Sequence, residues 1–320
     1  MTTSDRRAFL RTLAAGATLG LPLACGRSGG GASESGTSPH PEESLMTQTL
    51  DQASTGSATD RGTRMPVLFV GHGSPMNVIE DNRWRRGFEA LADLVPRPTA
   101  ILVVSAHWFV NGTFVTGDLR PRTIHDFSGF PRALYEIEYR APGQVDLARR
   151  IRKLVGEERA SLSTDWGFDH GNWAVLRSMY PAADIPVLQL SIDRRLSPER
   201  HLELGRDLAE LRRDGVLILG SGNLVHNLRD AFQRMRSSSA STPDWAQRFD
   251  DAVARSVRER DTRALLSLWP SDDGRLAHPS PDHFFPLLYA YGATDEGDAA
   301  SFPVEGFDLG SVSMRNVLFT

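Results

Sequence analysis

The chain alternates between short, almost purely apolar runs and longer segments whose apolar residues recur at helical spacing. The clearest apolar run is Val67–Val70, which ends in Gly71-His72-Gly73. Similar runs occupy Ala100–Ala106, Ile185–Ile192 and Gly215–Leu219. Apolar runs of about four to eight residues, bounded by turn formers, predict strands that are buried on both faces.

Segments with amphipathic spacing lie between these runs. We expect a helix over Ile79–Leu94, with Ile79, Trp84, Phe88 and Leu91 on its apolar face. Ser197-Pro198 should open another helix, because serine caps helix N-termini and proline fits the first turn. The other expected helices cover Gln144–Leu154, Trp245–Arg258, a segment that carries His226, and a segment from Ser280 that holds His283 in its first turn.

This alternation of strands and helices predicts an α/β fold of one domain, with a mostly parallel central sheet and helices on both faces. We expect Thr113–Thr116 to be an edge strand and Val312–Phe319 to be the closing strand. No internal repeat is evident. The folded domain should span residues 63–320, beginning near Arg64.

Residues 1–26 are typical of an export signal. Ser4-Asp5-Arg6-Arg7-Ala8-Phe9-Leu10 resembles the twin-arginine signature, and the apolar stretch Leu13–Leu23 is too short to span a bilayer. Cys25 stands where a bacterial lipoprotein cysteine would, although Pro22 departs from the usual aliphatic residue. We expect a protein that is periplasmic or anchored by lipid outside the cytoplasmic membrane. A basic N-terminal tail without a targeting role is the alternative.

The composition narrows the classes of function. Residues 27–62 are rich in Ser, Gly, Thr and Pro and predict a disordered tether. The 320 residues carry a formal net charge of −4, so nothing indicates a nucleic-acid partner, and the chain has no apolar run of about 18 residues that would span a membrane. Its single cysteine excludes an intramolecular disulfide and a cysteine-based zinc cluster, whereas nine histidines favour imidazole ligands.

Three predicted strands end at or shortly before a histidine: His72, His107 and His226. Parallel strands bring their carboxyl ends to one edge of the sheet, so these rings can converge on a divalent metal. A lone histidine at a strand end is more often structural, but the pair His72 and His107 favours a metal site. His226 fits either a ligand or an acid/base group beside the metal.

Two other histidines stand in aromatic loops. His170, in Trp-Gly-Phe-Asp-His-Gly-Asn-Trp, suits a positioned proton donor, although Asp169 could simply cap the helix that follows. His125, in Thr-Ile-His-Asp-Phe-Ser-Gly-Phe, is typical of a substrate loop, although ordinary loop polarity is an alternative. We assign no role to His40, His201 and His278.

Together these motifs resemble the 4,5-DOPA extradiol dioxygenases, which are LigB-type, class III ring-cleaving enzymes. The resemblance runs in order through residues 65–320, and the combination of motifs is specific. The motifs are Val-Gly-His72-Gly-Ser-Pro-Met-Asn, Val-Val-Ser-Ala-His107-Trp-Phe, His125-Asp-Phe-Ser-Gly-Phe-Pro, Trp-Gly-Phe-Asp-His170-Gly-Asn-Trp, Ser-Gly-Asn-Leu-Val-His226-Asn-Leu and Asp-His283-Phe-Phe-Pro-Leu-Leu-Tyr.

The resemblance implies roles for individual residues. His72 and His107 match the two metal-ligand histidines, and His226 matches the active-site base, placed close enough to bind metal as well. His170 matches a histidine with an acid/base or substrate role. His283 stands where the wider superfamily supplies a glutamate ligand, so the implied ligand set is His72, His107, His226 and His283.

The ligand set bears on the identity of the metal. Non-haem Fe²⁺ oxygenases usually present two histidines and one carboxylate, with open positions. Four imidazoles come close to a closed zinc site, and zinc has no redox chemistry. We therefore expect one divalent ion per chain, with Zn²⁺ as the ion bound and Fe²⁺ as the ion that supports oxygenase activity.

The resemblance implies extradiol cleavage of a catechol such as DOPA, in which O₂ is incorporated and a muconic semialdehyde is formed. Two alternatives belong to other classes. The first is a zinc-dependent hydrolase, in which His170 or Asp169 acts on a zinc-bound water. The second is a LigB-like protein that binds a metal without catalysis.

The export hypothesis predicts that the mature protein lies outside the cytoplasm and lacks the first 24 or 25 residues. Cell fractionation with determination of the N-terminus tests this. Full-length protein in the cytoplasm, with residues 1–25 intact, would overturn it.

Overall fold

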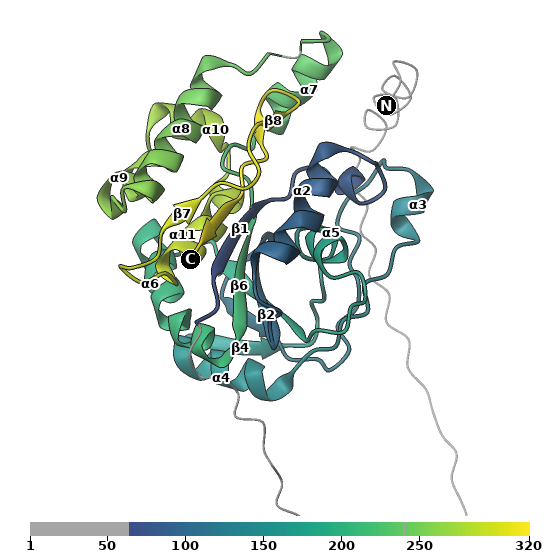
Figure 1. The fold of residues 1–320 in the computed structure, drawn as a ribbon, viewed down its shortest axis with the longest axis vertical. Helices are drawn as coiled ribbons and strands as arrows, with labels where there is room; N and C mark the ends of the chain where they lie inside the picture. Colours follow the sequence, from purple (N-terminus) through teal and green to yellow (C-terminus); the bar gives the residue numbers. More distant parts are fainter. Residues whose placement is uncertain (1–63, 240) are drawn as a thin grey trace, which may run out of the picture. The chain divides into compact units, whose positions relative to one another are not determined.

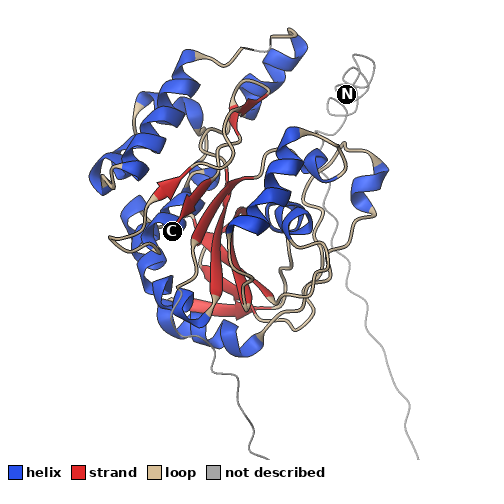
Figure 2. Ribbon diagram, viewed as in Figure 1, coloured by secondary structure: helices blue, strands red, loops and turns tan. Residues whose placement is uncertain are grey.

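The computed structural model describes residues 64–239 and 241–320. The predicted export signal, Cys25 and the predicted tether lie outside the described residues. Within them the chain forms an α/β fold in which a large, mostly parallel sheet carries helices on both faces (Figure 1; Figure 2). The predicted fold class is confirmed. None of the described helices combines the length and the apolar character needed to cross a membrane.

Eight of the described strands form one sheet in the order β4-β3-β5-β2-β6-β1-β10-β7. Its centre, β5-β2-β6-β1, is parallel throughout, whereas β10 runs antiparallel to β1 and β3 antiparallel to β5. The short strands β8 and β9 pair separately. The bounds are β1 Val67–Gly71, β2 Ala100–Val110, β3 Thr113–Thr116, β4 Ala160–Ser163, β5 Val187–Asp193, β6 Val216–Gly222, β7 Ala300–Ser301, β8 Phe307–Asp308, β9 Val312–Ser313 and β10 Val317–Phe319.

Helices α2 and α5 cover one face of the sheet, and α6 and α11 cover the other (Figure 1). The bounds are α2 Arg83–Leu91, α3 Arg132–Tyr135, α4 Val145–Val155, α5 His170–Met179, α6 Pro198–Leu208, α7 Leu228–Arg236, α8 Asp244–Arg258, α9 Thr262–Leu268, α10 Asp272–Ala277 and α11 Phe285–Gly292. Four 3₁₀ segments cover Pro75–Val78, Ala92–Leu94, Ala209–Asp214 and Pro281–His283 within the described residues.

The central strands divide the apolar residues between two cores. Along β1, Val67 and Phe69 pack into one buried cluster, whereas Leu68 and Val70 pack into the other. Successive side chains of a strand point to opposite faces, so an unbroken apolar run supplies both clusters. The pattern that predicted doubly covered strands therefore describes these strands correctly.

Two expected elements differ in extent. The predicted helix Ile79–Leu94 is divided, because Asn82 accepts hydrogen bonds from the backbone N–H groups of Trp84 and Arg85 and so caps α2. Ile79 consequently lies outside the helix and is 36% exposed, while Trp84, Phe88 and Leu91 are buried as expected. The predicted edge strand β3 is an interior strand, because β4 pairs with its other side.

The C-terminal expectation is also corrected. Val312–Phe319 is two strands, β9 and β10, interrupted where the Asn316 side chain accepts a hydrogen bond from the Gly71 backbone at 2.8 Å. His226 precedes α7, because Asn227 caps that helix by accepting a hydrogen bond from the Asp230 backbone. His226 instead forms an isolated bridge with Val312.

His201, which stands on the charged helix α6, is fully buried. Its Nδ1 lies 3.0 Å from the Tyr289 hydroxyl, and its ring packs against Phe285. Burial lowers the pKa of His201 to about 4, because a charged ring would lose its hydration.

This burial predicts a specific dependence of stability on pH. Between pH 6.5 and pH 4 the unfolded chain binds a proton at His201 that the folded chain does not, so the free energy of unfolding should fall as the pH falls. We expect His201 to account for a decrease of roughly 3 kcal/mol in the free energy of unfolding over this pH range. Urea titrations at several pH values give the free energy of unfolding at each pH. In the variant that combines His201→Leu with Tyr289→Phe, this free energy should depend less steeply on pH than in the unaltered chain. An unchanged slope would contradict the assignment.

Candidate active site

The site forms where the carboxyl ends of β1 and β2 meet the N-terminus of α5. His72 follows β1 directly and is buried. The next residue, Gly73, has φ of +60°, a left-handed conformation that costs glycine little. The Gly-His-Gly pattern thus reflects a tight turn that holds His72 at the sheet edge.

The sequence had suggested that His107 stands at the end of a strand, but His107 lies inside β2. The pairing of β2 with β5 shifts here: Val104 pairs with Leu190, and Phe109 with Ile192. The stretch Ser105–Trp108 therefore bulges opposite Ser191. Bulges turn side chains away from the regular pleat, and they are frequent near active sites. In this chain the bulge accompanies the placement of His107 beside His72.

His170 begins α5. Asp169 caps this helix by accepting a hydrogen bond from the Asn172 backbone at 3.2 Å, which confirms the capping interpretation of Asp169. Gly171 follows, and a Cβ at this position would lie 2.6 Å from the Ser105 hydroxyl and 2.9 Å from the His107 ring. Only glycine therefore lets the start of α5 approach β2 this closely.

The three rings converge. The ligand nitrogens of His72, His107 and His170 all lie within 4.8 Å of one another. The Nε2 atoms of His72 and His107 are 3.1 Å apart. Two nitrogens bound to one zinc ion at about 2.0–2.1 Å would be separated by roughly 3 Å, so this spacing suits a shared ion.

His283 and His226 extend the group. The ring of His283 lies 5.2 Å from that of His72 and 5.0 Å from that of His107, between centroids. Its Nδ1 is paired with Asp282 at 2.5 Å, whereas its buried Nε2 has no hydrogen-bond partner among the described residues. His226 stacks face to face on His283 at 3.5 Å. The buried Nε2 of His283 therefore fits the role of a metal ligand.

Two residues stand behind the cluster. Ser221 lies 3.0 Å from Nδ1 of His72 and donates a hydrogen bond to the Gly171 carbonyl at 2.5 Å. Asp126 accepts from Nδ1 of His170 at 2.9 Å, and the same oxygen lies 3.1 Å from Nδ1 of His107.

The electrostatics favour neutral rings. Burial first, and then the neighbouring histidines, hold the pKa values of His72, His107 and His226 well below 6.5. Metal ligation requires a neutral imidazole, so the donor set fits a divalent cation. All-imidazole donors suit zinc, iron, copper or nickel better than magnesium or calcium.

The two carboxyl groups beside His170 differ. Burial and the charge of Asp126 raise the pKa of Asp169 to about 6, although its bonds from Ser105 and Gln189 act in the opposite direction. For Asp126, burial favours the neutral acid, but the hydrogen bonds from His170 outweigh it and lower the pKa. Both groups are therefore mainly carboxylates at neutral pH, and Asp126 is the one that contacts the rings of His107 and His170.

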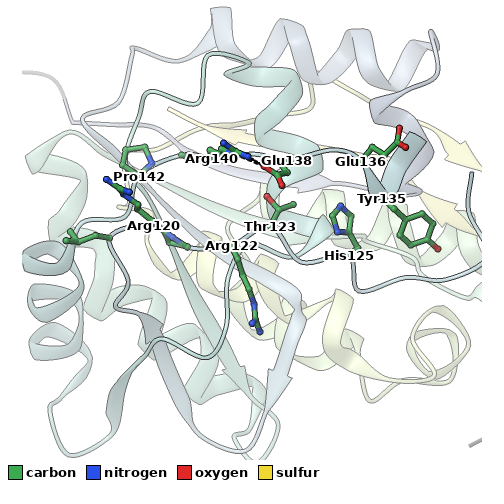
Figure 3. Close-up of a pocket in the computed structure, with 12 residues that line it drawn as sticks. Arg120, Arg122, Thr123, His125, Tyr135, Glu136, Glu138, Arg140 and Pro142 are labelled. Atoms are coloured by element: carbon green, nitrogen blue, oxygen red, sulfur yellow. Dashed lines mark hydrogen bonds and ion pairs between the residues drawn. The ribbon is translucent and has the colours of Figure 1, made fainter. Parts of the chain in front are cut away.

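His125 lies apart from the metal cluster. Its Nε2 is 3.0 Å from the Ile137 carbonyl, and its ring contacts Phe127, Tyr135 and Trp173. It borders a cavity of about 690 Å³ (Figure 3), where it lies near Tyr135 and away from the end formed by Arg120 and Pro142. Phe127 in turn contacts His170, with 5.5 Å between centroids, so aromatic rings link this cavity to the cluster.

The structure thus brings five of the six predicted site histidines together, with His125 separated by one aromatic ring. The group whose ligand atoms lie within 4.8 Å includes His170, which the sequence had suggested as an acid/base group, and does not include His226 or His283. Sequence reasoning missed Asp126 and Ser221. The only available signal was that each lies within a histidine or glycine motif.

Comparisons with known proteins show which proteins the chain resembles. The family model "Catalytic LigB subunit of aromatic ring-opening dioxygenase" matches residues 66–319. A protein of Escherichia coli (strain K12) named 4,5-DOPA dioxygenase extradiol is 47% identical over 259 residues, or 80% of this chain and 94% of that protein. Its namesake from Beta vulgaris is 38% identical over 261 residues, or 79% and 96%. A crystal structure of an uncharacterised protein from Escherichia coli K12 has a TM-score of 0.70 and 41% identity, covering 80% of this chain and all of that one.

The ring contacts predict which replacements abolish metal binding. His72→Ala and His107→Ala should each weaken binding by more than the roughly 10- to 100-fold typical of a residue behind a ligand. Zn²⁺ titration against a chromophoric chelator measures this. His125→Ala is the matched control and should bind like the unaltered chain. Normal affinity in either of the first two variants would refute the site.

Proposed function

Because the chain belongs to the LigB family of aromatic ring-opening dioxygenases, we propose that it cleaves a catechol such as DOPA in the extradiol position. O₂ is incorporated next to the diol, and the ring opens to a muconic semialdehyde. The observation that carries this proposal is the convergence of His72, His107 and His170 at one edge of the sheet. The names of the relatives from Escherichia coli and Beta vulgaris support the choice of substrate.

The histidines would hold one divalent ion. We assign His72 and His107 as ligands, together with His283, whose buried Nε2 lacks a partner among the described residues. When bound, Fe²⁺ would supply the redox chemistry that O₂ requires and the positive charge that favours a catecholate, whereas Zn²⁺ would supply only the charge. Zn²⁺ is the ion we expect as bound, and Fe²⁺ is the ion we expect for turnover.

His170 is our candidate for the base that takes a phenolic proton. Its Nδ1–H donates to Asp126, so its Nε2 carries the lone pair, and the carboxylate would stabilise the ring once protonated. His226 is the second candidate that the sequence offers. Its ring stacks on the ring of His283, a proposed ligand, so we propose that His226 helps to hold His283 in place.

Substrate contacts would come from the aromatic side of the cluster. Phe127 contacts both His125 and His170, so a ring bound next to His170 would meet an aromatic wall. Offset and edge-to-face contacts of this kind favour flat aromatic ligands. We therefore propose His125 as part of the substrate-binding wall.

A zinc-dependent hydrolase is the second candidate function. It is favoured by the all-imidazole donor set, which lacks the carboxylate ligand common in Fe²⁺ oxygenases. The same donor set could serve either chemistry, so metal loading must be varied in the test.

The test is anaerobic loading of the full chain with Fe²⁺, followed by addition of air and a panel that contains L-DOPA, catechol and protocatechuate. We expect oxygen uptake and a coloured ring-opened product, with no uptake by the Zn²⁺ form. In His170→Gln, kcat should fall by about 10²- to 10⁴-fold while the metal stays bound, because a general base contributes that range.

The variant that combines His201→Leu with Tyr289→Phe is the control and should retain activity, because these residues lie apart from the cluster. Absence of oxygen uptake with every diol, joined to turnover of an ester, amide or phosphoester by the Zn²⁺ form, would favour the hydrolase. Loss of metal in His170→Gln would move His170 into the ligand set.

A further inference from the structure

We propose that Asp126 is a positioning residue that sets the proton positions of two site histidines at once. Through one carboxylate it keeps the proton of His107 and that of His170 on Nδ1, so both rings present an unprotonated Nε2 to the centre. The inference rests on the metal site of the proposed function and goes beyond it, because the comparisons assign no role to Asp126.

The contacts of Asp126 use both of its oxygens. Oδ1 accepts a hydrogen bond from the His170 backbone N–H at 2.9 Å, and Oδ2 accepts one from His170 Nδ1 at 2.9 Å. Oδ2 also lies 3.1 Å from Nδ1 of His107. A negative oxygen this close to both Nδ1 atoms favours a proton on each, because Coulomb attraction is strong in a partly buried site.

The consequence lies on the opposite side of each ring. A neutral imidazole with its proton on Nδ1 has its lone pair on Nε2. Nε2 of His107 lies 3.1 Å from Nε2 of His72. With its proton on Nδ1, His170 has a lone pair on Nε2 that can bind a ligand or accept a proton. One carboxylate therefore prepares a metal ligand and the proposed base together.

His72 also carries its proton on Nδ1, but a different residue sets this proton position. The single hydroxyl proton of Ser221 is directed to the Gly171 carbonyl, so Ser221 can only accept from Nδ1 of His72. This leaves Nε2 of His72 unprotonated without help from Asp126. His72 is thus an internal reference for any effect on the other two rings.

Asp126 is held in place by the backbone around it. The Ile124 backbone N–H donates to the Phe168 carbonyl at 2.7 Å, and the Trp173 indole donates to the Ile124 carbonyl at 2.9 Å. These bonds fix the segment that carries Asp126 against the start of α5. The carboxylate is therefore positioned before any ligand binds, as a residue behind a metal ligand must be.

An amide cannot replace this carboxylate. If the amide oxygen of the Asp126→Asn variant accepted from the His170 backbone, its NH₂ group would face both Nδ1 atoms and draw the ring protons to Nε2. In the opposite orientation the NH₂ group would face the His170 backbone N–H, donor against donor. Asp126→Asn should therefore shift the ring protons or disturb the start of α5.

The experiment compares Asp126→Asn with Glu138→Gln, which removes one negative charge from the loop after α3. Glu138 lies on the cavity wall and pairs with Arg140 (Figure 3). Long-range ¹H–¹⁵N spectra of the full chain, labelled at histidine, report which ring nitrogen carries the proton. We expect Nδ1 protonation of His72, His107 and His170 in the unaltered chain. In Asp126→Asn the protons of His107 and His170 should move to Nε2, while His72 stays unchanged.

Zn²⁺ competition with a chelator gives the second readout. Asp126→Asn should bind about 10- to 100-fold more weakly, Glu138→Gln should bind normally, and Asp126→Glu, which keeps two acceptor oxygens, should recover part of the loss. An unchanged His72 signal shows that the variant is folded. If Asp126→Asn fails to fold, the Nδ1 protonation of the unaltered chain and the Zn²⁺ affinity of Asp126→Glu, compared with that of the unaltered chain, decide.

The outcomes separate the two proposals. If the unaltered chain binds no divalent metal, the proposed function fails, whereas the proton positions still test Asp126. If His107 and His170 carry their protons on Nε2 in the unaltered chain, or if Asp126→Asn shifts neither ring and binds Zn²⁺ normally, the role of Asp126 is refuted.

Discussion

The structure of the site depends on gathering several imidazoles in a buried space while keeping them neutral. Burial lowers the pKa values of His72, His107 and His226, since a charged ring would lose its hydration and repel its neighbours. Such a cluster is costly unless its polar atoms are satisfied. Ser221, Asp126 and Asp282 satisfy the Nδ1 side, which leaves the Nε2 side for a metal ion.

The sheet provides the rigidity that this arrangement needs. The parallel strands β1, β6 and β2 lie side by side and deliver His72, Ser221 and His107 from one edge. Helix α5 then closes the site, because Gly171 lets it approach the bulge in β2. Each functional side chain thus belongs to an element whose position is fixed by packing elsewhere in the domain, which keeps the rings at ligand spacing.

The aromatic residues beside the cluster link the metal site to the cavity at His125. Phe127 stands between His125 and His170, on the segment that also carries Asp126. The segment that forms the proposed substrate wall therefore also orients a proposed ligand and the proposed base. A change in this segment would be felt in both binding and proton transfer, because the three functions share one backbone.

The sequence determined the α/β class, the buried strands and the histidines of the site, because apolar runs and glycine-flanked histidines leave local patterns. It also offered a helix cap as one interpretation of Asp169, a role set by residues three positions apart. It could not reveal the bulge in β2, the interior place of β3 or the partners of the histidines. The bulge depends on the pairing of β2 with β5, and the interior place of β3 depends on its pairing with β4. The proton positions of the histidines depend on contacts such as that of His107 with Asp126. All of these partners are distant in the chain. Only the tertiary structure decided which nitrogen of each ring faces the centre, because that choice is made by hydrogen bonds between distant segments.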